Sequence, residues 1–253
     1  MRWGVVIVAG GFAPASLSAE LGTERKALAQ FGGKTSLEWT IDAVREAGIE
    51  DCVTVGGEDV RGHVRFGEWQ AERGSAVDNF SAGVEVLRTK PEALLPLPSD
   101  SPLLTAEMLR HFMASVEQRA AEQRWYAAGL SSLRDFSTAY PGVAAKSTRT
   151  REGRFLTGAL YALASSGLPP VLDLVHQIRH SRKSQFAVAR RLGLANMLLM
   201  LSGRASLANG EQALARAFGG QIIIVPDCHP ATCFDFDDPA EYRALVKFFP
   251  ERP

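Results

Sequence analysis

Residues able to hold a phosphate chain are gathered near the N-terminus. The apolar run VVIVAGG, at residues 5–11, ends in Ala9, Gly10 and Gly11, and Lys26 follows fifteen residues after the second glycine. Backbone N–H groups at the end of a strand can approach a phosphate closely where no Cβ intervenes, and a lysine adds a compact positive charge. A Gly-Gly pair alone is more typical of a tight turn, but together with the lysine it predicts a nucleotide-phosphate site.

Carboxylates that could hold a divalent cation follow two other apolar runs. Asp100 comes directly after ALLPLPS, and Pro102 stops the strand beyond it. Asp235 and Asp237 alternate with phenylalanines in FDFDDP, so both acids should face one way in an extended segment. Magnesium takes few protein carboxylates and completes its shell with water and phosphate oxygens, which favours Asp100 and Asp235 as its ligands. Alternatively, Asp100 only caps its turn; Asp237 and Asp238 are expected to organise the next helix.

A third polar segment, ERGSAVDN, places Gly74, Ser75 and Asn79 at the start of a helical pattern. A glycine-serine turn at a helix start can accept an anion or present backbone groups to a nucleotide base. Capping of the helix by Ser75 explains the pattern equally well, so this is the weakest of the three candidate binding segments.

These residues must be positioned by a sheet whose strands end at a common edge. Apolar, β-rich runs alternate with amphipathic helical patterns over residues 5–123, which predicts an α/β fold. We expect a three-layer αβα sandwich around a mostly parallel, Rossmann-like sheet. Ligands of such sheets bind at the carboxyl ends of the strands. In SLEWTIDAVREAG, Ser36 should cap a helix that Gly48 ends.

The second half of the chain is less regular. Residues 129–165 resemble strands around a polar loop, SSLRDFSTAYPG, and residues 167–218 look helical, with a buried helix at 192–201. A last strand at 221–227 precedes a helix that a capping box starting at Asp238 should open. No linker interrupts the pattern, so residues 1–253 are expected to form a single domain.

Bulk composition excludes several classes of function. The 253 residues carry 28 basic and 28 acidic side chains, so charge gives no reason to expect a nucleic acid or a membrane as a partner. The N-terminus lacks a signal-peptide pattern and the three cysteines read as reduced thiols, so we expect a cytoplasmic protein. No Ser/His/Asp or Cys/His arrangement indicates nucleophilic catalysis.

Together these motifs resemble those of the MobA-like nucleoside-triphosphate transferases, which include the molybdenum-cofactor guanylyl- and cytidylyltransferases. The resemblance rests on residues 5–11, 26–34, 99–104 and 234–242, which occur in the family's order and spacing. It implies a fold of the nucleotide-diphospho-sugar transferase, or GT-A-like, type.

The resemblance also implies a reaction. A nucleoside triphosphate, GTP or CTP, would give its NMP group to a phosphorylated small-molecule or cofactor acceptor with release of pyrophosphate. Lys26 and Asp100 would be the catalytic residues, and Asp100 and Asp235 would hold Mg²⁺. An ionised phosphate acceptor needs no general base, so positioning and electrostatics would supply the catalysis.

Two segments depart from the family pattern. Relatives usually carry an arginine in the loop after AGG, whereas residues 12–25 have none before Arg25, so Arg25 and Lys26 are expected to share the phosphates. This loop should bury little apolar area, so we expect it to be mobile without ligand and to close as a lid over a triphosphate. Ala159 stands where a glycine is common, in the region that shapes the acceptor pocket.

Two other functions fit part of the sequence. A degenerate nucleotide-binding or regulatory domain would explain the altered loop, and a nucleotide-sugar glycosyltransferase could use the same fold. The glycosyltransferase should show a DxD motif in mid-chain, and here the DxD lies late, at residues 235–237. AGGFAPAS does not fit GxGxxG, which argues against a dinucleotide-binding oxidoreductase. The base of the triphosphate, the acceptor and the oligomeric state stay open.

Overall fold

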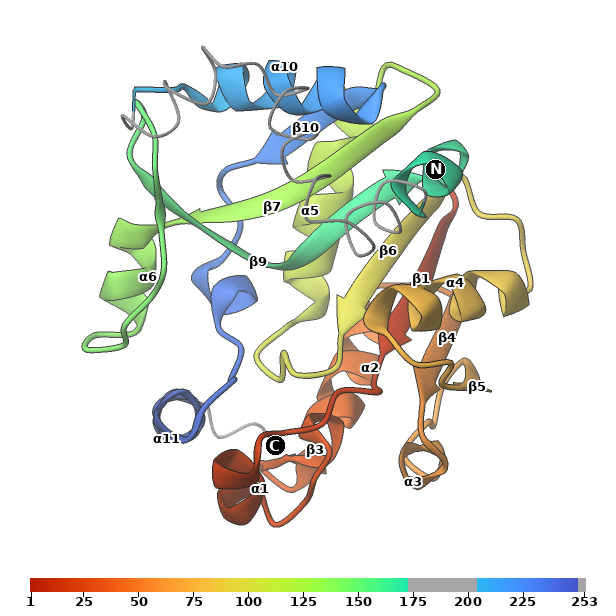
Figure 1. The fold of residues 1–253 in the computed structure, drawn as a ribbon, viewed down its shortest axis with the longest axis vertical. Coiled ribbons are helices and arrows are strands. Elements are labelled where there is room, and N and C mark those ends of the chain that lie inside the picture. The colour runs from red at the N-terminus through yellow and green to blue at the C-terminus, as the bar shows by residue number, and fades with distance from the viewer. Residues whose placement is uncertain (173–203, 250–253) are drawn as a thin grey trace, which may run out of the picture.

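The computed structural model describes residues 1–172 and 204–249, which are built around one mixed sheet (Figure 1). Its strands follow the order β10-β7-β9-β6-β1-β4-β5, and β8 pairs with β9 beside this row. The strands span Trp3–Val8 (β1), Asp51–Gly56 (β4), Glu68–Ala71 (β5), Ala93–Pro98 (β6), Trp125–Ser132 (β7), Thr148–Arg149 (β8), Arg154–Ala164 (β9) and Gln221–Val225 (β10). β6, β1, β4 and β5 are parallel, β10 is parallel to β7, and β9 is antiparallel to β6 and β7.

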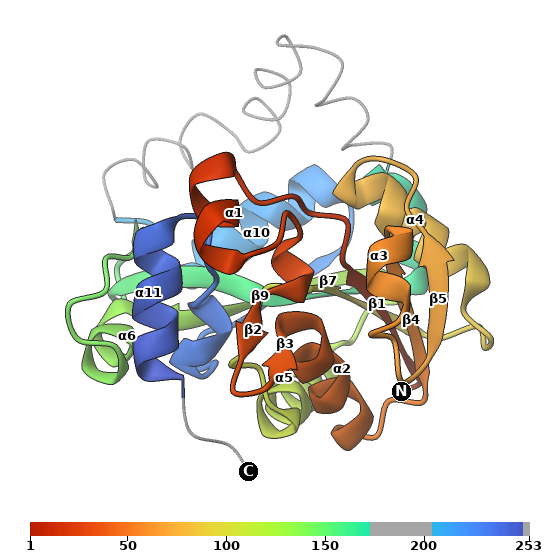
Figure 2. The same cartoon turned by 90° about the horizontal axis from the view of Figure 1, so that it is seen from below.

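Helices cover both faces of this sheet (Figure 2). Alternate residues of β1 show the two layers, because Val5 and Ile7 share a core with α2 and α5, whereas Val6 shares one with α4 and α10. These helices span Ser36–Glu46 (α2), Ala76–Val86 (α4), Ala106–Arg119 (α5) and Leu207–Phe218 (α10). The α/β sandwich predicted from the alternating pattern is confirmed.

Shorter elements connect these layers. They are α1 (Ala15–Leu21), β2 (Gln30–Phe31), β3 (Lys34–Thr35), α3 (Glu58–Arg61), α6 (Leu133–Ala139), α11 (Pro239–Phe248) and the 3₁₀ turns η1 (Lys26–Leu28), η2 (Ser165–Gly167) and η3 (Pro230–Cys233). In the described chain, no helix is both long and apolar enough to cross a bilayer.

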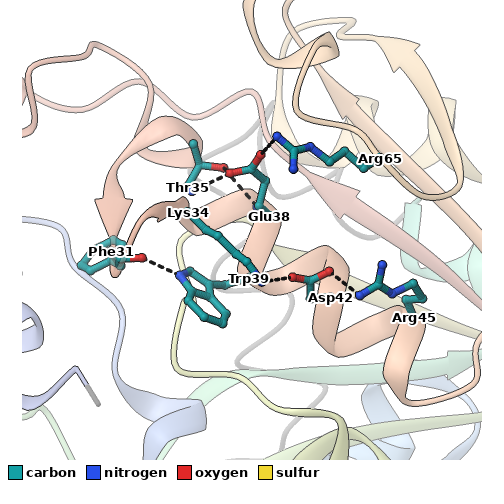
Figure 3. A network of polar contacts seen from close by, with 8 residues as sticks. All are labelled: Phe31, Lys34, Thr35, Glu38, Trp39, Asp42, Arg45 and Arg65. Atoms are coloured by element: carbon teal, nitrogen blue, oxygen red, sulfur yellow. Dashed lines mark hydrogen bonds and ion pairs between the residues drawn. The ribbon is translucent and has the colours of Figure 1, made fainter. Parts of the chain in front are cut away.

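The hairpin β2-β3 sets the start of α2 (Figure 3). Gly32 and Gly33 both adopt positive φ, which turns the chain into β3. Thr35, and not Ser36 as predicted, is the N-cap, and it forms a capping box with Glu38. The one-residue error has a physical reason, since the Ser36 hydroxyl is buried and donates instead to the carbonyl of Ser99, 2.7 Å away.

Charged pairs on α2 secure the same hairpin (Figure 3). Lys34 donates to Asp42 over 2.8 Å, and its ammonium lies 4.5 Å from the centre of the Trp39 ring. The Trp39 indole N–H donates to the carbonyl of Phe31, and Arg65 pairs with Glu38. Lys34 is therefore held on the hairpin by its own partners.

The segment expected to be a polar loop at residues 131–142 contains α6 instead. Ser132 caps this helix, and Phe136 is buried against Tyr140 and Phe234. About two turns of helix with one buried aromatic side chain give too short a periodic pattern to recognise in sequence. Of the helical stretch expected at 167–218, the structure describes helical residues 168–172 and α10, and the proposed buried helix at 192–201 lies outside the described residues.

Aromatic side chains join the two ends of the described chain. Phe31 of β2 lies 5.5 Å from Phe236, 5.6 Å from Tyr242 and 5.4 Å from Phe249, measured between ring centres. As predicted, Asp238 and Glu241 form a capping box that opens α11. The last helix is thereby fixed beside the N-terminal hairpin.

Strand β10 lies at the end of the strand row, and its outer edge is already bonded. Glu211 of α10 accepts from the backbone N–H of Ile224, and Arg119 of α5 donates to the carbonyl of the same residue. The side chain of Gln221 bonds to the backbone near the end of α5. Side chains thus take the place of a further strand at this edge.

Candidate functional site

A cleft of about 780 Å³ opens at the carboxyl ends of β1 and β6. Its described lining includes most of the residues proposed from sequence for nucleotide and metal binding: Gly10, Gly11, Lys26, Gly74, Asn79 and Asp100. The parallel pairing of β1 with β6 brings the glycine turn and Asp100 to one edge of the sheet, although 89 positions separate Gly11 from Asp100. This edge is where ligands of parallel α/β sheets bind.

The three residues that end the VVIVAGG run have different surroundings. Ala9 is fully buried, and its N–H donates to the carbonyl of Val55 over 2.7 Å. A Cβ on Gly10 would lie 2.5 Å from a carboxylate oxygen of Glu72 and 2.8 Å from the amide nitrogen of Asn79, so a side chain there would force both of these groups to shift. No described atom lies within 4 Å of where a Cβ of Gly11 would sit. The backbone is therefore open to a ligand at Gly11 and closed at Ala9.

Lys26 stands between two carboxylates at this edge. Its ammonium lies 3.2 Å from Asp100 and also pairs with Asp237, while its side chain keeps only 13% of its surface exposed. Burial opposes the charge on the ammonium, but the carboxylates of Asp100 and Asp237 outweigh it and raise the pKa of Lys26. Asp237 has two contacts, because its carboxylate pairs with Lys26 while its backbone N–H donates to Glu241 over 2.7 Å at the start of α11, where Asp238 is the N-cap.

Asp235 faces the same group of charges. Phe234 and Phe236 are buried while Asp235 and Asp237 are exposed, so the alternation predicted from sequence is confirmed. Asp235 keeps contact with solvent, yet the surrounding protein atoms desolvate its carboxyl, and together with the charges of Asp100 and Asp237 they raise its pKa to about 6. A bound cation would reduce the repulsion among these three carboxylates and would favour the ionised form of Asp235.

The donor set suits magnesium chemically. Asp100, Asp235 and Asp237 supply only carboxylate oxygens, the ligands that Mg²⁺ prefers. Within the described residues, no cluster of three or more acidic, histidine or cysteine side chains is close enough to hold a metal by itself. The assignment of Asp100 and Asp235 as ligands stays a prediction.

The turn at Gly74–Asn79 forms the opposite lip of the cleft. Ser75 caps α4 through a capping box with Asp78, so the capping explanation for Ser75 is confirmed. Gly74 has a φ of 125°, a conformation that favours glycine. Asn79 is buried, and its side-chain oxygen accepts from the N–H of Arg73 over 2.7 Å. Binding of a nucleotide by this turn stays a prediction.

Arg25 does not line the cleft with its neighbour Lys26. Its guanidinium forms hydrogen-bonded ion pairs with Glu72, at 2.7 and 3.0 Å, and with Asp59, at 3.0 Å. It also donates to the carbonyl of Gly10 over 2.9 Å. A phosphate contact by Arg25, as expected from sequence, would therefore require its guanidinium to leave two acidic partners.

Residues 12–25 are mostly exposed, as predicted, but they contain a helix that the sequence analysis did not predict. Seven of these residues form α1, which ends at Gly22, and Leu17 on this helix is fully buried. Phe12 pairs with Arg25 as a β-bridge, which closes the base of the loop. The segment therefore carries a helix of its own, and its closure over a triphosphate stays a prediction.

The far wall of the cleft is apolar. It is formed by Tyr126, Tyr161, Leu163, Leu214, Phe218 and Ile222, together with Ala159 of the expected acceptor region. Lys26 and Asp100 are the charged side chains among the described lining residues. In the described lining, the charged side chains thus lie near the glycine turn, and the rest of the wall provides apolar contacts.

Sequence reasoning missed the acids that surround Arg25 and the partner role of Asp237. Glu72 and Asp59 lie 47 and 34 positions from Arg25, and no local pattern links them.

The sequence predicts that the cysteines are reduced and structural. All three are free, and burial is the main reason that the pKa of Cys52 and of Cys228 rises to about 12.

The strand order, the glycine turn after β1 and the acid after β6 form an α/β fold of the nucleotide-diphospho-sugar transferase type. The chain belongs to the family of MobA-like NTP transferase domains, whose model matches residues 5–139. The matched region contains the glycine turn, Lys26, the Gly74–Asn79 turn and Asp100. No protein of curated function matches the sequence.

Solved structures share this fold. A hypothetical transferase from Thermus thermophilus is 27% identical, with a TM-score of 0.79 over 95% of this chain and 99% of that one. The 2-C-methyl-D-erythritol 4-phosphate cytidylyltransferase of the same species is 15% identical, with a TM-score of 0.55 over 98% of each chain. A CMP:2-keto-3-deoxy-manno-octonic acid synthetase solved with CTP is 15% identical, with a TM-score of 0.57 over 98% of each chain.

Proposed function

We propose that this protein is a magnesium-dependent nucleotidyltransferase that moves an NMP group from a nucleoside triphosphate to a phosphorylated small-molecule or cofactor acceptor and releases pyrophosphate. The observation that carries the proposal is the position of Lys26, buried between Asp100 and Asp237 beside the open backbone of Gly11. A lysine held by carboxylates can exchange these partners for phosphate oxygens without moving far. Family membership supports a nucleoside triphosphate as the substrate.

Each group of residues in and beside the cleft would bind a different part of the substrate or the metal. The backbone at Gly10 and Gly11 would lie along the phosphates, and Lys26 would neutralise charge that shifts toward the leaving pyrophosphate. Asp100 and Asp235 would hold Mg²⁺, which when bound would neutralise phosphate charge and align the reacting groups. The turn at Gly74–Asn79 would contact the nucleoside.

The reaction needs positioning more than proton transfer. An ionised phosphate oxygen of the acceptor would form a bond to the α-phosphorus while the bond from that phosphorus to the bridging oxygen of pyrophosphate breaks. The electron pair of the broken bond leaves on pyrophosphate, so no proton has to be removed. The apolar side chains of the far wall would contact the body of the acceptor away from its phosphate.

CTP is the first triphosphate to test, with GTP second. Two of the structures that share the fold are a cytidylyltransferase and a synthetase solved with CTP. Calorimetric titration of each of the four ribonucleoside triphosphates, with Mg²⁺ and with EDTA, would identify the base. Binding of one triphosphate only with Mg²⁺ supports the proposal, and binding of none would overturn it.

Variants locate the binding to this cleft. Asp100→Asn and Lys26→Ala should each weaken the magnesium-dependent binding. Lys34→Ala is a matched control, because it removes a lysine that belongs to the Asp42 and Trp39 contacts outside the cleft. Pyrophosphate release with a panel of phosphorylated acceptors would then separate an enzyme from a domain that only binds nucleotide.

A further inference from the structure

Arg25 connects three segments that meet behind the glycine turn. It contacts the carbonyl of Gly10 after β1, Asp59 of α3, and Glu72 just after β5. The Phe12 ring lies 3.9 Å from the guanidinium and covers it. The side chain of Arg25 keeps only 8% of its surface exposed. The described lining of the cleft includes Gly10 and Asn79 but neither Arg25 nor Glu72.

We propose that Arg25 is a positioning residue that, with Glu72, sets the distance between the phosphate-binding turn at Gly10 and the nucleoside-binding turn at Gly74–Asn79. This inference rests on the proposed function, because it concerns how the same cleft holds a nucleoside triphosphate. On this proposal, Glu72 favours the binding of the triphosphate even though both carry negative charge.

The geometry links the two turns through one ion pair. Glu72 accepts from both terminal nitrogens of Arg25, and its carboxylate fills the space behind Gly10 that a Cβ would need. The next residue, Arg73, donates its N–H to the side-chain oxygen of Asn79, whose amide nitrogen also lies behind Gly10. Arg25 fixes the Gly10 carbonyl directly and the second turn through Glu72.

Charge and hydrogen bonding argue against a direct phosphate contact by Arg25. Four of the guanidinium's N–H groups are used by Glu72, Asp59 and Gly10, and a guanidinium has five. Moving Arg25 to a phosphate would leave Glu72, whose side chain is only 25% exposed, without its cation. Breaking a largely desolvated pair in this way is unfavourable.

The substitution Glu72→Gln separates the two roles by the sign of its effect. If Arg25 contacted phosphates, removing the negative charge of Glu72 would free it, and triphosphate binding would tighten. If the Arg25–Glu72 pair positions the two turns, binding should weaken by about tenfold or more, since small misplacements of binding groups are costly. The measurement is calorimetric titration with the triphosphate that the wild type binds, with Mg²⁺ present.

Controls distinguish failure of this inference from failure of the proposed function. A wild type that binds no triphosphate would overturn the proposed function. A wild type that binds, with unchanged or tighter binding by Glu72→Gln, would overturn only the role of Arg25. Glu68→Gln removes an equal charge from the same region of β5, where Glu68 pairs with Arg88 on the surface, and should leave binding unchanged.

A second variant keeps the test valid if Glu72→Gln fails to fold. Arg25→Lys retains the positive charge but loses the fork that grips Glu72 with two nitrogens. It should weaken binding to a similar extent and raise the rate of hydrogen exchange at the N–H groups of residues 10–11 without ligand. Wild-type affinity and unchanged exchange in folded Arg25→Lys would contradict the positioning role.

Discussion

Lys26 keeps two carboxylates together that would otherwise repel each other at the mouth of the cleft. Lys26→Ala should lower turnover by about 10²- to 10³-fold, the loss typical of removing one group that stabilises transition-state charge. The free energy of unfolding should fall by only about 1–3 kcal/mol, because Asp100 and Asp237 lose a hydrogen-bonded cation. Pyrophosphate release and urea unfolding measure the two effects.

Lys26→Arg tests whether a compact ammonium is required. A planar guanidinium fits the space between Asp100 and Asp237 differently, so turnover should recover only in part. Full turnover in Lys26→Ala would show that the residue is only a structural counter-ion. Lys34→Ala should change neither turnover nor nucleotide binding.

Asp235 makes the stability of the protein depend on pH. Its folded-state pKa of about 6 lies above the ordinary value of 3.8, so between these values the folded protein binds more protons than the unfolded chain. The contribution of Asp235 to stability therefore falls as the pH rises through this window. Asp235→Asn should raise the free energy of unfolding at pH 7 by about 1 kcal/mol, a value reduced for solvent screening, and should change little near pH 4.

Thermal unfolding at both pH values checks this prediction. A Tm of Asp235→Asn that stays below that of the wild type at pH 7 would contradict it. The matched comparison is Asp237→Asn, which removes a partner of Lys26 and should destabilise the protein instead.

At the scale of elements, α1 turns the loop after the glycines into a packed structure. Leu17→Ala should lower the free energy of unfolding by about 2–4 kcal/mol, as expected for a fully buried leucine. Urea unfolding measures the loss, and Ser16→Ala on the exposed side of the same helix is its control. Hydrogen exchange should show protection of residues 18–21 without ligand, and free exchange there would favour a segment that is mobile until it closes over a triphosphate.

The elements that could be predicted are those with a long or chemically distinct local pattern. The strand ending at the glycine turn, the helix α2 and the capping box at Asp238 all follow from neighbouring residues. α1 and α6 were missed, because each is seven residues long with one buried apolar side chain. The ion pairs of Arg25 depend on residues far away in the chain, which no local pattern encodes.

At the scale of the molecule, the aromatic cluster of Phe31, Phe236, Tyr242 and Phe249 joins the two ends of the described chain, and we expect these ends to unfold together. Phe31→Ala should lower the free energy of unfolding by about 3–5 kcal/mol, the usual cost of truncating a buried phenylalanine. It should also weaken magnesium-dependent binding, because Phe236 lies between Asp235 and Asp237.

Urea unfolding followed by fluorescence and by circular dichroism tests this cooperativity. The two curves should coincide in the wild type. Separate transitions would show that the C-terminal helix unfolds independently. Val246→Ala is a suitable control, since Val246 is 48% exposed on α11 and lies outside the aromatic cluster.

The bonded edge of β10 bears on how the protein behaves in a crowded solution. An open edge would expose backbone groups to any extended peptide, including the same strand of another molecule, and such edges nucleate aggregates. Glu211 and Arg119 occupy both outward backbone groups of Ile224, so an incoming strand would first have to displace two charged side chains. Protection from self-templating at this edge thus depends on two surface residues that take no part in the cleft.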